Sequence, residues 1–213
     1  GTPVATVVSY GGGSLGGDET SYVQGTSQAF AGGTITVNAD GSLTVDNPTM
    51  DGNYTFTYRL SNTSGFSNAE VVISILSVPV AQNDQYEFLY TADQNVNGAA
   101  GLFADNGSGA DELAFPAATL TSFGGGDLGG AVGDQTAGST VTLAGGDLTV
   151  NADGSWTMTG QPFTPGIYTF DYQISNVAGT STATVTFVIH DPPITQKDSL
   201  SMDINAMTAL VAG

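Results

Sequence analysis

The sequence contains no cysteine, so it can form neither a disulfide bond nor a thiolate metal site. Basic residues are almost as scarce, because Arg59 and Lys197 stand against 20 Asp and Glu residues and the net charge is −18. Such a negative surface repels nucleic acid and anionic membranes, which argues against both as partners. No apolar run approaches the length of a membrane-spanning helix, and we expect no membrane insertion.

Recognisable catalytic groupings are absent as well. The single histidine, His190, ends an alternating apolar run, and no serine motif with a supporting acid accompanies it. The glycine runs at 11–13 and 124–126 lack the helix and the lysine of a phosphate-binding loop, and they favour tight turns or bulges instead. The sequence therefore predicts that the protein is not an enzyme and that it needs no cofactor, Ca²⁺ being the one possible exception.

The most informative feature that is present is a repeat. Asn-Ala-Asp-Gly-Ser occurs at 38–42 and again at 151–155, a shift of 113 positions. Alternating apolar runs enter and leave each copy, and glycine readily adopts the positive φ that a tight turn requires. Each copy therefore predicts a β-hairpin. Downstream the shift becomes 114, and the segment 54–62 repeats as 168–176.

The repeated downstream segments alternate apolar and polar residues, which indicates strands with one buried face. A second alternating strand is predicted at 69–76 and again at 183–190, and a proline-containing linker follows each. No segment has a helical period. Short strands separated by turn signals predict an all-β fold of two tandem immunoglobulin-like, or cadherin-like, β-sandwich modules.

These motifs together resemble a known class of repeats. The Asn-Ala-Asp-Gly-Ser turn is followed by Tyr-Thr-Phe-x-Tyr-x-x-Ser-Asn at 54–62, then by a Thr/Val-rich strand, proline and Asn83-Asp84. This order is similar to the cadherin-like, immunoglobulin-like tandem repeats of large bacterial surface proteins and adhesins. The resemblance covers both copies and implies a structural role outside the cell or at the cell surface. Such modules are mostly spacers and stalks, and a surface glycan or cellular target stays open.

The resemblance also raises the question of calcium, because members of this class often carry an Asp-rich linker or loop associated with Ca²⁺. The corresponding loop here spans 103–112. Carboxylate and amide oxygens are ligands that Ca²⁺ takes in proteins. The candidate ligands are Asp84, Asp105, Asn106, Asp111 and Glu112. A solvated acidic loop is the alternative, and the sequence leaves both open.

The ends of the chain are out of phase with the repeat. The segment 84–90 supplies a first strand to the second module, whereas residues 2–6 correspond to 115–119, beyond that strand. We therefore expect a first module at 1–78 that lacks its first strand, and a complete second module at 79–192.

The remaining tail, 193–213, repeats the pattern of a first strand without a module after it. We expect it to donate a strand to the first module of the next copy, which joins subunits head to tail into a filament. Each buried apolar side chain would contribute about 1.5–3 kcal/mol. The predicted interface residues are Leu200, Met202, Ile204 and Leu210. The alternative is a fragment of a longer array, namely stalk or spacer modules of a large Ca²⁺-dependent bacterial adhesin.

Overall fold

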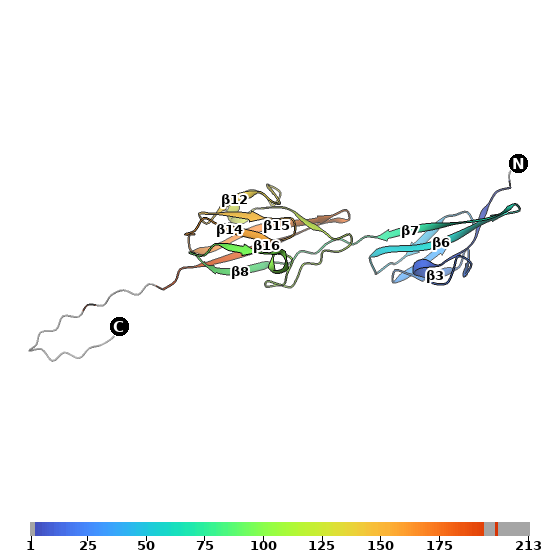
Figure 1. Ribbon diagram of the computed structural model, residues 1–213, viewed down its shortest axis with the longest axis horizontal. Coiled ribbons are helices and arrows are strands. Elements are labelled where there is room, and N and C mark those ends of the chain that lie inside the picture. The colour runs from blue at the N-terminus through green and yellow to red at the C-terminus, as the bar shows by residue number, and fades with distance from the viewer. Residues whose placement is uncertain (1–2, 194–198, 200–213) are drawn as a thin grey trace, which may run out of the picture.

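The computed structural model describes residues 3–193 and Ser199. This part of the chain consists of strands, loops and three single-turn 3₁₀ helices. The strands form four sheets, two in each of two β-sandwich modules that lie end to end (Figure 1). The predicted all-β tandem sandwich fold is confirmed. The predicted donor strand, with Leu200, Met202, Ile204 and Leu210, lies outside the described residues.

The N-terminal module contains a four-stranded sheet and a three-stranded sheet. Its strands are β1 (Thr6–Gly11), β2 (Tyr22–Val23), β3 (Ser27–Phe30), β4 (Gly33–Val37), β5 (Leu43–Asp46), β6 (Gly52–Asn62) and β7 (Gly65–Ile75), and its 3₁₀ helix is η1 (Gly13–Leu15). The first sheet has the order β2-β1-β6-β7 and the second the order β3-β4-β5. All pairs are antiparallel.

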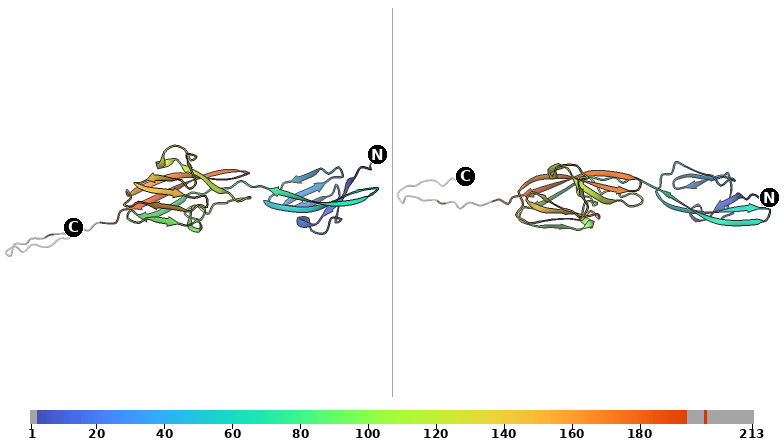
Figure 2. Two further views of the ribbon diagram at one scale, coloured as in Figure 1. Left: turned by 45° about the horizontal axis from the view of Figure 1, so that its top comes forward. Right: turned by 90° about the horizontal axis from the view of Figure 1, so that it is seen from above.

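The C-terminal module repeats this arrangement and adds one strand to each sheet. Its elements are β8 (Asp84–Leu89), β9 (Gln94–Val96), η2 (Gly98–Ala100), β10 (Thr119–Gly124), η3 (Gly126–Leu128), β11 (Gln135–Thr136), β12 (Thr140–Leu143), β13 (Gly146–Val150), β14 (Trp156–Thr159), β15 (Gly166–Asn176) and β16 (Gly179–His190). The sheet orders are β11-β10-β15-β16-β8 and β12-β13-β14-β9, and β8 pairs with β16 in parallel. Figure 2 shows the two modules from two further sides. Strands β1 to β7 belong to the sheets of the first module, and strands from β8 onward belong to those of the second. The exact module limits at 78 and 79 stay a prediction.

The two copies of the sequence motif form the two predicted hairpins, β4–β5 and β13–β14, in the same register. In each turn the Asp carboxylate accepts the backbone N–H of the Ser two residues later, at 2.9 Å in the first copy and 3.0 Å in the second. The glycine between them has a φ of 86° at Gly41 and 78° at Gly154, which a side chain would strain. We call residues counterparts when they correspond by the shift of 113, or of 114 from β6 onward.

The long strands begin earlier than their sequence pattern indicated. The strands predicted at 69–76 and 183–190 start at Gly65 and Gly179, directly after tight turns from β6 and β15. In the second of these turns the side chain of Asn176 accepts the N–H groups of Ala178 and Gly179. The first residues of both strands carry little apolar character, so the period of two could not mark them, and pairing with the preceding strand extends them.

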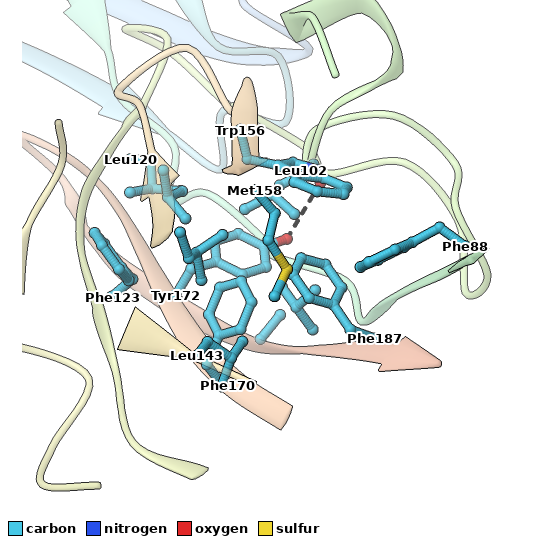
Figure 3. Close-up of a cluster of buried hydrophobic side chains, with 14 of the residues drawn as sticks. Phe88, Leu102, Leu120, Phe123, Leu143, Trp156, Met158, Phe170, Tyr172 and Phe187 are labelled. Atoms are coloured by element: carbon cyan, nitrogen blue, oxygen red, sulfur yellow. Dashed lines mark hydrogen bonds between the residues drawn. The ribbon is translucent and has the colours of Figure 1, made fainter. Parts of the chain in front are cut away.

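The core of the C-terminal module lies between its two sheets. Alternate residues of β15 and β16, including Phe170 and Phe187, are completely buried between the two sheets. Figure 3 shows Phe88 of β8 and Leu102 of the following loop packed into the same cluster. Residues 101–112 are mostly Gly, Ala and polar residues, which gives no sign of a core segment, yet Leu102 has 0% exposure. The first strand and its loop therefore supply part of this core.

The two hairpin glycines provide a matched test of this packing. We expect Gly41→Ala to cost roughly 1–2 kcal/mol, the strain of a left-handed residue, because no other atom lies within 4 Å of the added Cβ. We expect Gly154→Ala to cost more, because its Cβ would lie 3.0 Å from the Phe103 ring. Urea unfolding followed by circular dichroism measures both. Equal losses would show that the Phe103 contact contributes nothing.

Candidate functional site

Within the described residues, each of the two sheets of the N-terminal module ends in an unpaired strand whose counterpart in the C-terminal module is paired. In the C-terminal module β8 pairs with β16, and β9 pairs with β14. The counterpart of β16 is β7, and the counterpart of β14 is β5. Within the described residues β7 pairs only with β6, and β5 pairs only with β4. Both unpaired edges lie on the side that β8 and β9 occupy in the C-terminal module. An edge of this kind exposes backbone donors and acceptors that another strand can use.

The same side of the N-terminal module also exposes apolar side chains. Leu43 is 43% exposed, whereas its counterpart Trp156 is 1% exposed. Tyr58 and Leu60 are half-buried, although the alternating pattern predicted inward-facing residues. Their counterparts Tyr172 and Ile174 are completely buried. The buried core of the N-terminal module contains seven apolar residues, against 18 in the C-terminal module. In the part of the chain that is described, the N-terminal module has no strands equivalent to β8 and β9 to cover its core.

A cavity of about 280 Å³ lies between the edges of β5 and β7. In the C-terminal module Leu102 enters the equivalent space and donates its backbone N–H to the carbonyl of Gly154 at 2.9 Å. The counterpart of Gly154 is Gly41, which lines the cavity. The residues that line it are Ala5, Val7, Val37, Ala39, Asp40, Gly41, Leu43, Phe56, Tyr58, Leu60 and Val71. The cavity is therefore the place of a core segment.

A second cavity, of about 340 Å³, adjoins this one at the start of β7 and is lined by Asn62, Gly65 and Ser67. Their counterparts hold the linker that enters the C-terminal module. Asn176 donates its amide to the carbonyl of Ser77 at 2.9 Å. The hydroxyl of Ser181 accepts the N–H of Ala81 at 3.0 Å.

A third cavity, of about 440 Å³, lies at the other end of β7, between 48–51 and 75–77. In the C-terminal module Tyr90 lies in the corresponding region, with its N–H donated to His190 and its carbonyl accepting the N–H of Phe163. The three cavities thus follow the path that residues 77–103 take over the C-terminal module. We call this path on the N-terminal module, along β5 and β7, the open groove.

The predicted calcium ligands are only partly brought together. Asp84 is 3% exposed, and its Oδ2 is buried without a hydrogen-bond partner in the described part of the chain. Beside it, the Asp111 carboxylate accepts the hydroxyl of Tyr172 at 2.9 Å and the N–H of Gln82 at 2.7 Å. Burial, and then the charge of Asp111, raise the pKa of Asp84 to about 7. Burial also raises the pKa of Asp111.

The other three candidate ligands make separate contacts or face solvent. The Asp105 carboxylate accepts the N–H of Gly109 at 3.0 Å within its own exposed turn. Asn106 uses its amide nitrogen to donate to oxygens of its own loop and to the Tyr86 hydroxyl. Glu112 is exposed. Across residues 3–193 and Ser199, no three acidic or histidine side chains converge closely enough to hold a metal. Two carboxylates do not supply the six or more oxygens of a calcium site, and calcium binding stays a prediction.

His190 faces solvent, as expected from its place opposite the apolar face of its strand. It lies 3.2 Å from the exposed Glu87 of β8, and this is an ion pair only when the imidazole is protonated. Among the described residues, the side-chain contact of His190 is with Glu87, and no serine or threonine hydroxyl shares it. No helix in the part of the chain that is described is long and apolar enough to cross a membrane.

Sequence reasoning found the first strand, β8, but missed β9 as a strand. The segment Gln94–Val96 is short and has a single apolar residue, so it carries almost no period of two. It pairs with β14 through Trp156↔Val96. One signal could have indicated it: Leu210 in the tail corresponds to Val96 by the shift of 114, so an apolar residue recurs at this position of the repeat.

Comparisons with known proteins return solved structures only. No family model matches the chain, and no curated protein matches its sequence. Extracellular domains 3–5 of Drosophila OTK are 14% identical, with 89% of this chain and 52% of that chain covered and a TM-score of 0.39. The insect immune protein hemolin is 10% identical over 89% of this chain and 40% of that chain, with a TM-score of 0.38.

An endo-fucoidan hydrolase, MfFcnA9 of glycoside hydrolase family 107, is 20% identical over 76% of this chain and 27% of that chain, with a TM-score of 0.32. The chain thus spans about half or less of the length of these three structures. Likenesses this weak assign no function.

The counterparts Ile75 and Ile189 test whether the groove is open in a single molecule. Ile189 is 3% exposed, and we expect Ile189→Ala to cost roughly 2–5 kcal/mol of unfolding free energy. Ile75 is only half-buried, so Ile75→Ala should cost less than half as much in unassembled protein. Urea titration of dilute protein, read by circular dichroism, gives both values. Comparable losses would mean that the groove is closed.

The buried Asp84 predicts an unusual pH dependence. Its folded pKa lies above that of the unfolded chain, so the stability it contributes is present below about pH 4 and is lost as pH rises through about 7. Asp84→Asn keeps the shape without the charge and should flatten the fall in melting temperature between pH 5 and pH 8. The exposed Asp147→Asn serves as the control. The interpretation is wrong if both variants retain the wild-type slope.

Proposed function

We propose that the protein is a structural, non-enzymatic subunit of an extracellular filament or surface fibre. In this proposal the C-terminal segment of one copy fills the open groove of the N-terminal module of the next copy. The observation that carries it is the pair of free edges on β5 and β7, at the positions where β14 and β16 hold β9 and β8. An unpaired edge beside exposed core is costly, and strand addition relieves both costs.

The tail has the residue pattern that the groove requires. In β8 the inward Tyr86 and Phe88 alternate with the exposed Gln85 and Glu87. The corresponding tail residues are Leu200 and Met202, which alternate with Ser199 and Ser201. Leu210 corresponds to Val96 of β9, so the tail supplies counterparts to both missing strands.

Relative to the equivalent contact in the C-terminal module, aliphatic residues replace aromatic ones in both the tail and the groove. In the C-terminal module Tyr86 packs on Trp156 with ring centroids 4.8 Å apart, and Phe88 packs on Phe187 at 5.4 Å. The groove carries aliphatic counterparts of both partners, Leu43 for Trp156 and Ile73 for Phe187. The tail likewise replaces both aromatic residues, with Leu200 and Met202. Aliphatic side chains would thus meet aliphatic side chains, in a joint smaller than the aromatic one.

The junction inside the chain provides the template for a junction between chains. After β7 the chain passes through a linker and enters the next module as β8, parallel to β16. A tail that left β16 and entered the groove of another copy would repeat this path. The contact is head to tail and uses two different surfaces, so it generates an open polymer unless it closes into a ring. Ladder hydrogen bonds would add roughly 0.5–1.5 kcal/mol each.

The spacer alternative differs in one respect. In a stalk of tandem modules, the groove would be filled by residues of the same polypeptide that precede the N-terminal module. The two functions are therefore distinguished by whether copies of this chain join through the tail.

Charge placed on the inward tail positions tests the proposal against a matched control. Leu200→Asp with Met202→Asp puts two carboxylates into the apolar groove, and we expect assembly to be abolished. Ser199→Asp with Ser201→Asp adds the same charge on the outward positions and should assemble as the wild type does. Sedimentation of the full chain across a concentration series, with electron microscopy of the pellet, measures this.

Two outcomes would contradict the proposal. A wild-type chain that remained monomeric at every concentration would remove the filament function. Equal assembly by the inward and outward variants would show that the alternating face of the tail does not enter a groove.

A further inference from the structure

We propose that Lys197 of the donated tail forms an ion pair with Glu70 of the accepting module, and that this pair fixes the register of the joint. This inference rests on the proposed function, and it identifies the residues by which one copy recognises the next. The position concerned lies just before β8, where the linker contacts β16.

The parallel pairing of β8 and β16 fixes the geometry of that position. Asp84 lies opposite Val185, and the residues before them, Asn83 and Thr184, are neighbours. The side-chain oxygen of Asn83 accepts the backbone N–H of Thr184 at 2.8 Å. Val185 points into the core, so Thr184 lies on the outer face of β16. Asn83, directly before β8, is exposed at the edge of that strand.

At the joint between copies both members of this neighbouring pair are replaced. The counterpart of Asn83 in the tail is Lys197, and the counterpart of Thr184 on β7 is Glu70. Within the chain, the Asn83 side chain binds the main chain of Thr184, whose hydroxyl donates to the Asp171 carboxylate at 2.7 Å. Between chains, two side chains of opposite charge would stand at these positions. Adjacent strands lie roughly 4.8 Å apart, so the ammonium and carboxylate groups can meet on the outer face.

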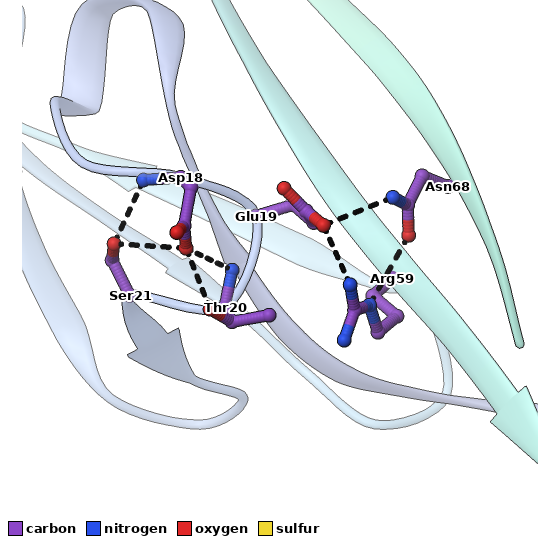
Figure 4. Close-up of polar contacts among 6 residues, drawn as sticks. All are labelled: Asp18, Glu19, Thr20, Ser21, Arg59 and Asn68. Carbon is purple, nitrogen blue, oxygen red and sulfur yellow. Dashed lines mark hydrogen bonds and ion pairs between the residues drawn. The ribbon is translucent and has the colours of Figure 1, made fainter.

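Glu70 is available for such a partner. It is exposed, and its neighbour on β6 is the uncharged Thr57. Within residues 3–193 and Ser199, the carboxylate of Glu70 makes no ion pair or side-chain hydrogen bond. The nearest cation along the sheet, Arg59, is already bound: it lies 2.6 Å from Glu19, which Asn68 also contacts (Figure 4).

The composition makes this pairing selective. Lys197 is the only lysine in a chain of net charge −18, so two copies approach against electrostatic repulsion. A joint displaced by two residues would keep the apolar face inward but would move Lys197 away from Glu70. Like charges opposite one another on neighbouring strands are destabilising, and opposite charges are stabilising. The pair therefore favours the register in which Leu200 and Met202 meet their counterpart positions.

Two charge-reversed full-length chains test the pair by mixing. In Lys197→Glu the tail places a carboxylate beside Glu70, and in Glu70→Lys the groove places an ammonium beside Lys197. We expect each variant alone to need a concentration on the order of fivefold higher than wild type for half-maximal assembly at low salt. In an equimolar mixture every joint between unlike chains has opposite charges, so assembly should return to within about twofold of wild type.

Three further measurements make the test decisive. Asp147→Lys changes net charge as Glu70→Lys does, on an exposed site of the C-terminal module, and should not impair assembly. Raising ionic strength to about 1 M shortens the screening length to about 3 Å and should erase the difference between the separate variants and the mixture. Urea unfolding of each variant checks that both fold as the wild type does.

Failure of the inference is distinguishable from failure of the filament function. If wild type assembles but the mixture is no better than the separate variants, the Lys197–Glu70 pair is wrong and the filament stands. If the Asp147→Lys control is impaired as strongly, net charge and not register is the cause, and the pair is again overturned. If wild type does not assemble, the filament function is wrong, and the pair with it.

Discussion

A strand added at the edge of a β-sandwich covers the core beside it, and within residues 3–193 and Ser199 only the C-terminal module carries such added strands, β8 and β9. β8 and β9 each extend one sheet of the C-terminal module, and Trp156 and Phe187 are buried beside them. On the N-terminal module no strand of the described residues pairs with the equivalent edges of β5 and β7, and Leu43 is exposed. Backbone groups and apolar surface are thus open along one path, and a single extended segment could cover both.

The internal repeat turns this comparison into a physical argument, because each module is a control for the other. The hairpin that turns at Gly41 and the hairpin that turns at Gly154 have the same strand register. Where residues 77–103 cross the C-terminal module, cavities follow the same path across the N-terminal one. Trp156 and Phe187 correspond to the aliphatic Leu43 and Ile73 of the N-terminal module, and Tyr86 and Phe88 correspond to the aliphatic Leu200 and Met202 of the tail. This parallel change favours the proposed joint between the two surfaces.

Much of the fold could be predicted because its signals are local. Alternation identified β6, β7, β15 and β16, and the Asp-Gly turn identified both hairpins, since turn chemistry and the period of two act over a few residues. What could not be predicted depends on tertiary contact. β9 has one apolar residue, and Leu102 and Phe103 are a short apolar pair among Gly, Ala and polar residues. The burial of Asp84 beside Asp111 arises only when the loop folds over β8. For the same reason sequence spacing grouped Asp105 and Glu112 with them, although both side chains face solvent.

The account depends most directly on what lies beside β7 when copies of the chain associate. Electron cryo-microscopy of assembled protein, at a resolution that traces the main chain, would show it. We predict a strand parallel to β7 along Val71–Ile75, continuous with β16 of a neighbouring copy. A map in which that edge is bare, or in which the added strand belongs to the same molecule, would contradict the account.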